Sequence, residues 1–191
     1  MKHDVLIAGF GGQGILLMGQ LIADAAMDEG LFVTWFPSYG PEMRGGTANC
    51  TTIYSDAEIG SPISAQYDYV IAMNQPSLER FAPLVRIGGT LLVNSSVVPI
   101  RYERDGIKVV YVSATEAART AGAERVGNVV MLGALVGLES GLSLPSFDRA
   151  IEHVIGQKRP ETVEANLAAL RAGQSAVLEK DISNRPVHQL C

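Results

Sequence analysis

A glycine-rich segment near the start of the chain has the spacing of a phosphate-binding turn. Gly9, Gly11 and Gly14 fit the pattern G-x-G-x-x-G, directly after the apolar run 5–8. In such turns the glycines allow a tight bend, leave room for a pyrophosphate and let the next helix pack closely. That helix would direct unpaired N–H groups at an anion, although similar turns also occur where they serve packing alone. The candidate binding residues of this turn are Gly9, Gly11, Gly12, Gln13 and Gly14.

A second candidate is the loop after the next predicted strand, with the sequence Ser-Tyr-Gly-Pro-Glu-Met-Arg-Gly-Gly over residues 38–46. Loops at the carboxyl ends of strands line the ligand crevice of a doubly wound sheet, so this loop should neighbour the glycine turn. The planar guanidinium of Arg44 suits a carboxylate or phosphate, whereas a local ion pair with Glu42 is the alternative. Its composition favours a functional role. The candidate binding residues here are Ser38, Tyr39, Gly40, Glu42, Arg44 and Gly45.

The chain lacks the acidic residue that an NAD site uses to hold the ribose hydroxyls. That residue is expected at the end of the second strand, within 34–38, where no Asp or Glu occurs. Asp24, Asp28 and Glu29 have about the right separation in sequence. They belong to the first predicted helix or its exit, where they cannot reach a ribose in the usual way. The glycine turn is therefore better interpreted as one edge of a shared pocket or of a subunit contact.

Composition excludes several classes of protein. The chain has 191 residues, 47% of them hydrophobic, which is enough for one domain with a core. The net charge of −5 argues against nucleic-acid binding, and no uninterrupted apolar run is long enough for a membrane span. A strand follows Met1 almost at once, without a secretory signal, so a cytoplasmic location is expected. We predict a single domain over residues 1–180 and a C-terminal tail over 181–191.

Few residues have the spacing of catalytic groups or metal ligands. Cys50 and Cys191 are isolated and form no C-x-x-C pair, so neither a zinc site nor an iron–sulfur cluster is expected in this chain. Cys50 is predicted to be a small buried apolar residue in a strand. His3, His153 and His188 have no companions at metal-ligand spacing, and His153 is expected on a helix surface. The sequence predicts no catalytic residue and no metal ligand.

Strand-like and helix-like patterns alternate along the first two thirds of the chain, and only helices follow. The strands are predicted at 5–8, 32–36, 47–54, 69–73, 90–93 and 107–112. The helices are predicted at 15–26, at 76–87 with Gly88-Gly89 as its stop, around 115–119, at 128–139, from Ser146, and at 161–170. This order predicts an α/β fold: a Rossmann-like, doubly wound, mostly parallel sheet with a helical C-terminal part.

Several single residues are expected to shape the helices. Ser113, Asn128 and Ser146 are predicted N-caps, because their side chains can accept from free N–H groups of a first turn. Gly133 and Gly137 lie in a predicted helix and indicate close packing against another helix. Gly173 is expected to mark the end of the last helix or a break in it.

Three segments together resemble a known family, the gamma subunits of 2-oxoacid:ferredoxin oxidoreductases. They are the glycine turn at 9–14, the loop at 38–46, and the helix at 128–135 with Asn166 and Gly173 further on. The loop is much more specific than the turn. The resemblance runs in order along almost the whole chain and leaves out only the part after about Leu178.

The resemblance implies a subunit rather than a self-sufficient enzyme. Such complexes convert a 2-oxoacid, coenzyme A and oxidised ferredoxin to acyl-CoA, CO2 and reduced ferredoxin. Thiamine diphosphate, magnesium and iron–sulfur clusters are expected mainly on other subunits, so this chain alone holds none of them. The implied partners are thiamine-binding alpha and beta subunits, a ferredoxin-like delta subunit in addition, and ferredoxin through the complex. The chain would help to form the active-site wall and the access route for coenzyme A, with Arg44 placing an anionic group.

Other interpretations of the sequence remain open. One is a stand-alone Rossmann-type NAD(P)-dependent dehydrogenase, and another is a non-catalytic module that binds coenzyme A or a nucleotide. The indolepyruvate branch of the resembled family has a similar domain. Among the 2-oxoacids, overall similarity favours 2-oxoglutarate, with pyruvate next.

Overall fold

The computed structural model describes residues 1–39, 46–123 and 125–183, and their main element is a six-stranded sheet. Its strands are β1 (Lys2–Phe10), β2 (Phe32–Tyr39), β3 (Thr47–Ser55), β4 (Tyr67–Ala72), β5 (Val85–Asn94) and β6 (Lys108–Val112). The order across the sheet is β2-β3-β1-β4-β5-β6. β4 is parallel to β1 and β5, and β6 is parallel to β5. The predicted α/β class with a mostly parallel sheet is therefore confirmed.

The exception to the parallel arrangement is β3, which runs antiparallel to both of its neighbours. It forms a hairpin with β2 and pairs with β1 along its whole length, from Lys2 opposite Ser55 to Phe10 opposite Thr47. β2 is thereby displaced to the edge of the sheet. In a Rossmann sheet the second strand lies directly beside the first and supplies the ribose-binding acid. Here an antiparallel strand occupies that place.

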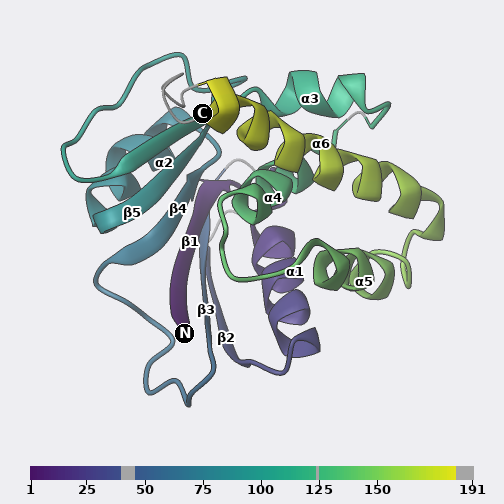
Figure 1. Cartoon of the computed structure of the whole chain (residues 1–191), viewed down its shortest axis with the longest axis horizontal. Helices are drawn as coiled ribbons and strands as arrows, with labels where there is room; N and C mark the ends of the chain where they lie inside the picture. The colour runs from purple at the N-terminus through teal and green to yellow at the C-terminus, as the bar shows by residue number, and fades with distance from the viewer. Residues whose placement is uncertain (40–45, 124, 184–191) are drawn as a thin grey trace, which may run out of the picture.

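Helices cover both faces of the sheet, with most of them on one face (Figure 1). The helices are α1 (Ile15–Asp28), α2 (Gln75–Phe81), the 3-10 turn η1 (Ala82–Leu84), α3 (Ala114–Thr120), α4 (Gly127–Gly137), α5 (Leu144–Val154), the 3-10 turn η2 (Pro160–Thr162) and α6 (Val163–Ser183). In Figure 1, α1, α4, α5 and α6 gather on one side of the strands. In the described part of the chain, no helix has both the length and the apolar character needed to cross a membrane.

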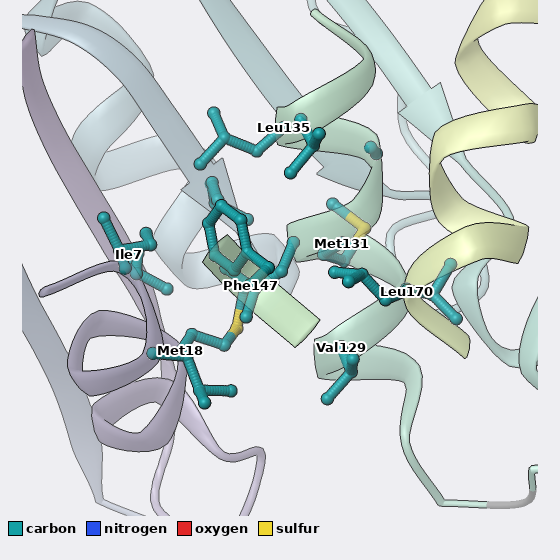
Figure 2. Packing of buried hydrophobic residues seen from close by; sticks show 14 of the residues in the cluster. Ile7, Met18, Val129, Met131, Leu135, Phe147 and Leu170 are labelled. Atoms are coloured by element: carbon teal, nitrogen blue, oxygen red, sulfur yellow. The ribbon is translucent and has the colours of Figure 1, made fainter. Parts of the chain in front are cut away.

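Side chains along β1 point alternately to the two faces of the sheet, so β1 contributes to two separate hydrophobic cores. Val5 and Ile7 face the larger core, which α1, α4, α5 and α6 complete, whereas Leu6 faces a smaller core that includes Leu78 of α2. Because both faces of β1 are covered, its central residues form an unbroken apolar run. Figure 2 shows part of the larger core, where Phe147 of α5 lies amid side chains from the other elements.

α4 and α6 pack with their backbones in close contact, as the glycines of α4 predicted. A Cβ atom added at Gly133 would lie 1.8 Å from the carbonyl oxygen of Leu170. A Cβ added at Gly173 would likewise lie 1.8 Å from the carbonyl oxygen of Val130. The expectation that Gly173 ends or breaks the last helix is wrong, because α6 continues to Ser183 and uses this glycine for the contact.

Several predicted boundaries differ from the structure. Residues 37–39, predicted as loop, belong to β2, where they pair with β3. Gly88 and Gly89 lie inside β5 and do not stop a helix, since α2 ends at Phe81. Ser113 is the N-cap residue of α3, although its side chain makes no capping hydrogen bond.

Two predicted N-caps are wrong. The N-cap of α4 is Val126, so Asn128 lies within the first turn of that helix. The N-cap of α5 is Ser143, whose side chain accepts from the N–H of Ser146 at 3.4 Å. The side chain of Ser146 is buried, and its hydroxyl donates to Glu29 at 2.5 Å.

The C-terminal expectations fall largely outside the described residues. α6 includes residues 181–183, which the sequence predicts as part of the tail, and residues 184–191, with His188 and Cys191, are not described. The domain boundary at residue 180 stays a prediction.

Candidate functional site

The glycine turn joins β1 to α1, as the sequence predicted. β1 ends at Phe10 and α1 begins at Ile15, with Gly14 as its N-cap. Gly12 and Gly14 have φ angles of 98° and 75°. Other residues rarely adopt this left-handed conformation, so the path of the turn depends on glycine at both positions.

Gln13 fastens the turn to the end of β4 with its side-chain carboxamide. Oε1 accepts from the N–H of Phe10 at 2.7 Å and from Nδ2 of Asn74 at 3.0 Å. Nε2 donates to the carbonyl oxygen of Met73 at 3.1 Å. Gly9 leaves space for this arrangement, because a Cβ at that position would lie 2.7 Å from Gln13 Oε1. The carboxamide of Gln13 therefore clamps the turn within this chain, and its part in binding a ligand stays a prediction.

We expect Gln13→Ala to lower the free energy of unfolding by about 2 kcal/mol, because it leaves part-buried polar partners without their hydrogen bonds. Amide hydrogen exchange at residues 10–14 should become faster in the same variant, since the turn loses its tie to β4. Urea denaturation and exchange mass spectrometry measure the two effects. Gln20→Ala is the matched control, because Gln20 is an exposed glutamine on α1. Equal losses in both variants would contradict the clamp.

The second candidate segment meets the glycine turn at the same edge of the sheet. The N–H of Gly11 donates to the carbonyl oxygen of Gly46 at 2.9 Å. Thr47, the first residue of β3, pairs with Phe10, the last residue of β1. The expected proximity of the two segments is thus confirmed at Gly46. The antiparallel direction of β3 produces it, because β3 begins at the carboxyl end of β1.

The candidate residues of this loop divide into two groups. Ser38 and Tyr39 are the last residues of β2 and pair with Asn49 and Ala48 of β3. The side chain of Tyr39 is 58% exposed. The other candidates, Gly40, Glu42, Arg44 and Gly45, lie outside the described residues.

A cleft of about 780 Å³ opens beside the glycine turn. Its walls come from the turn, the ends of β4 and β5, the starts of α3 and α4, the end of α5 and the segment leading into α6. The lining residues include Gly12, Gln13, Gly14, Asn94, Arg125, Asn128, Lys158, Arg159 and Asn166.

The beginnings of α1 and α4 touch at this cleft. A Cβ added at Gly14 would lie 2.4 Å from Nδ2 of Asn128, so the Asn128 side chain would have to shift, whereas the φ angle of 75° requires glycine in any case. Asn128, which the sequence suggested as a cap, instead lies against the glycine turn. Asn166, one of the residues on which the family resemblance rests, also lines the cleft, and its Nδ2 donates to the carbonyl oxygen of Thr162 at 2.7 Å.

Sequence reasoning missed the cationic residues of the cleft. Arg125, Lys158 and Arg159 come from two connections that are more than thirty residues apart in the sequence. No recognisable motif surrounds them. The only signal was their position in short segments between predicted helices.

The acids of the first helix take no part in the cleft. Asp28 accepts from Nε of Arg149 at 3.0 and 2.9 Å, and this hydrogen bonding lowers the pKa of its carboxyl group. Asp24 contacts Nδ1 of the exposed His153 at 3.0 Å. These contacts join α1 to α5, so the carboxylates are structural, in agreement with the expectation that they do not hold a ribose.

Cys50 is a buried residue of β3, as predicted. Burial raises the pKa of its thiol to about 12, which keeps it protonated and unreactive at neutral pH. Within residues 1–39, 46–123 and 125–183, no group of three or more His, Cys, Asp or Glu side chains could hold a metal ion.

Residues 4–176 match the family model described as pyruvate ferredoxin/flavodoxin oxidoreductase. The chain belongs to this family. The resemblance inferred from the glycine turn, the loop and α4 is therefore confirmed.

Relatives of the pyruvate ferredoxin/flavodoxin oxidoreductase family differ in length. Ketoisovalerate oxidoreductase subunit VorA of Methanothermobacter thermautotrophicus is 42% identical over 170 residues, which are 88% of this chain and 35% of VorA. The chain thus spans about a third of the length of that relative. 2-Oxoglutarate synthase subunit KorC of Methanothermobacter marburgensis is 33% identical over 186 residues, 94% of this chain and 98% of KorC.

Solved structures of the family have the same fold. The gamma subunit of the keto/oxoacid ferredoxin oxidoreductase from Geobacter sulfurreducens superposes on this chain with a TM-score of 0.79 at 29% identity. The match covers 94% of this chain and 98% of the Geobacter chain. The 2-oxoglutarate:ferredoxin oxidoreductase of Magnetococcus marinus, solved with 2-oxoglutarate, coenzyme A and succinyl-CoA bound, gives a TM-score of 0.83 at 23% identity. The match covers 93% of this chain but only 31% of the Magnetococcus chain.

Proposed function

We propose that this chain is the gamma subunit of a thiamine-diphosphate-dependent 2-oxoacid:ferredoxin oxidoreductase. The observation that carries the proposal is the family match over residues 4–176, together with the nearly full-length similarity to KorC. The hydrogen bond between Gly11 and Gly46 supports it further, because it joins the two segments that are most typical of the family. The reaction is the conversion of a 2-oxoacid, coenzyme A and oxidised ferredoxin to acyl-CoA, CO2 and reduced ferredoxin.

The role of this chain in the reaction is to form part of the active-site wall and the access route for coenzyme A. Thiamine diphosphate with magnesium supplies the decarboxylation chemistry and iron–sulfur clusters carry the electrons, and both belong to partner subunits. The partners are thiamine-binding alpha and beta subunits and a ferredoxin-like subunit. The glycine turn and the segment at 38–46 face the thiamine-binding subunits, and Arg44 helps to place an anionic group of coenzyme A.

The substrate is a 2-oxoacid that the partner subunits select. Relatives of this chain carry the names of 2-oxoglutarate, pyruvate and ketoisovalerate enzymes. The candidates to be compared are therefore 2-oxoglutarate, pyruvate and 2-oxoisovalerate, with 2-oxoglutarate favoured by the relative KorC, whose match covers 94% of this chain.

Reconstitution tests this function directly. The thiamine-binding and ferredoxin-like subunits are purified with and without this chain, and reduction of ferredoxin is followed with each 2-oxoacid and coenzyme A. We expect turnover with one of the acids only when this chain is present. Full activity of the remaining subunits without it would refute the proposal. In the active complex, Arg44→Ala should raise the KM for coenzyme A or lower turnover, and no change in either would remove Arg44 from the site.

A further inference from the structure

The glycine turn carries a single side chain by which it can be fastened. Residues 11–14 read Gly-Gly-Gln-Gly, so Gln13 alone among them has a side chain. Gly12 and Gly14 hold φ angles of 98° and 75°. Glycines lose much conformational freedom on folding, so the position of such a segment depends on the contacts that restrain it. A residue that orients Gln13 therefore influences where the turn and the start of α1 lie.

Asn74, which follows β4, orients the side chain of Gln13. Its Nδ2 donates to Gln13 Oε1 at 3.0 Å, and the N–H of Phe10 donates to the same oxygen at 2.7 Å. Gln13 Nε2 in turn donates to the carbonyl oxygen of Met73 at 3.1 Å. Turning this carboxamide over would set its nitrogen against two donors and its oxygen against a carbonyl oxygen. The three contacts therefore allow one orientation of Gln13.

The same Asn74 side chain caps a helix on the other face of the sheet. Asn74 is the N-cap of α2, with extended φ and ψ angles of −156° and 168°, and its Oδ1 accepts from the N–H of Ser77 at 2.9 Å. α2 packs in the smaller core, whereas α1 packs in the larger one. Asn74 is 2% exposed, so water cannot easily replace either partner. One buried carboxamide thus joins the start of α2 to the glycine turn.

We propose that Asn74 is a positioning residue for the glycine turn, acting through Gln13. Gln13 and Met73 line the cleft beside the turn, whereas Asn74 is not among its described lining residues, so it acts there through its neighbours. Without the Asn74 donor, Gln13 Oε1 loses one of its two partners and the turn is held less firmly to β4. The loosening of the turn rests on these contacts, whereas its consequence for the use of coenzyme A rests on the proposed function.

Two substitutions of Asn74 separate the contact with the turn from the helix cap. Asn74→Ser keeps an oxygen for the N–H of Ser77, since serine and asparagine are comparable N-caps, but its side chain is too short to reach Gln13. Asn74→Ala removes both contacts. In residue-resolved amide exchange of the full chain, residues 10–14 should exchange about fivefold faster in both variants, as for one lost hydrogen bond. The amide of Ser77 should exchange faster in Asn74→Ala alone.

Gln75→Ala is the matched control, because Gln75 is the next residue and its side chain donates to Glu79 at 2.8 Å on the surface of α2. It should leave the exchange of residues 10–14 at the wild-type rate. Wild-type exchange of residues 10–14 in Asn74→Ser would overturn the proposal.

A double-mutant cycle tests whether Asn74 acts through Gln13. Asn74→Ser should have no further effect on the exchange of residues 10–14 in a Gln13→Ala chain, because the group through which it acts is already absent. Effects of the two substitutions that simply add would overturn this part of the proposal.

The assembled oxidoreductase distinguishes positioning from a general loss of stability. Asn74→Ser should raise the KM for coenzyme A about fivefold and leave kcat and the KM for the 2-oxoacid within about twofold of the wild type. A general folding defect would instead lower kcat and leave both KM values unchanged, and that result would overturn the positioning role. If the wild-type assembly oxidises no 2-oxoacid, the proposed function fails, and amide exchange with the double-mutant cycle still decides the role of Asn74.

Discussion

Gly133→Ala is expected to destabilise the protein by about 3 kcal/mol, although alanine is the better helix former. The added Cβ would lie 1.8 Å from the carbonyl oxygen of Leu170, which is backbone and cannot rotate away. α4 and α6 would have to separate, and the buried side chains between them would lose contact. Intrinsic helix propensity alone predicts the opposite sign, a gain of up to about 1 kcal/mol.

Urea denaturation of the wild-type chain and the variant measures this difference. Gly60→Ala is the matched control, because no atom lies within 4 Å of a Cβ at Gly60 and its φ angle is not positive. The control should change the free energy of unfolding by less than about 0.5 kcal/mol. A Gly133→Ala chain as stable as the wild type would show that the α4–α6 contact is looser than the structure has it.

Phe147→Ala is expected to cost about 3–5 kcal/mol, the range for removing a fully buried phenylalanine. Phe147 on α5 is 0% exposed and belongs to the larger core. In Figure 2 its ring lies between Ile7 and Met18 on one side and α4, with Leu135, on the other. Truncation leaves a cavity at the point where the sheet, α1, α4 and α5 meet, and these elements cannot all collapse into it.

The thermal and urea-induced unfolding of this variant should shift together, since the cavity affects the whole core. Phe32→Ala serves as the comparison, because Phe32 is 49% exposed on the edge strand β2. Its loss should cost about 1 kcal/mol, in proportion to the smaller apolar area buried. Similar losses in the two variants would mean that Phe147 is not a central contact of the core.

The local features of the site could be predicted because each depends on residues close in sequence. The glycine spacing at 9–14 defines a strand–turn–helix unit, and the structure has Gly12 and Gly14 at positive φ angles. The glycines of α4 predicted a close helix contact, because a missing side chain within a helix favours the approach of another backbone. The loop at 38–46 and the turn pointed to the family that residues 4–176 match.

The predicted caps failed because several capping residues compete within a few positions. Ser143 and Ser146 can each accept from free N–H groups, but the hydroxyl of Ser146 donates to Glu29 and Ser143 is the N-cap. Asn128 likewise contacts the glycine turn from within the first turn of α4. Tertiary contacts therefore determine which residue is the N-cap of each helix, and the local sequence alone does not predict it.

The sequence by itself determined the alternation of strands and helices, the glycine turn and the family. The tertiary structure alone decided the order and direction of the strands, since an apolar run forms a parallel or an antiparallel strand equally well. It inserted β3 between β1 and β2, which removes the place of a ribose-binding acid and returns the chain at Gly46 to the glycine turn. It also brought Arg125, Lys158 and Arg159 to one cleft, because side chains far apart in sequence meet only when packing of the helices sets their distances.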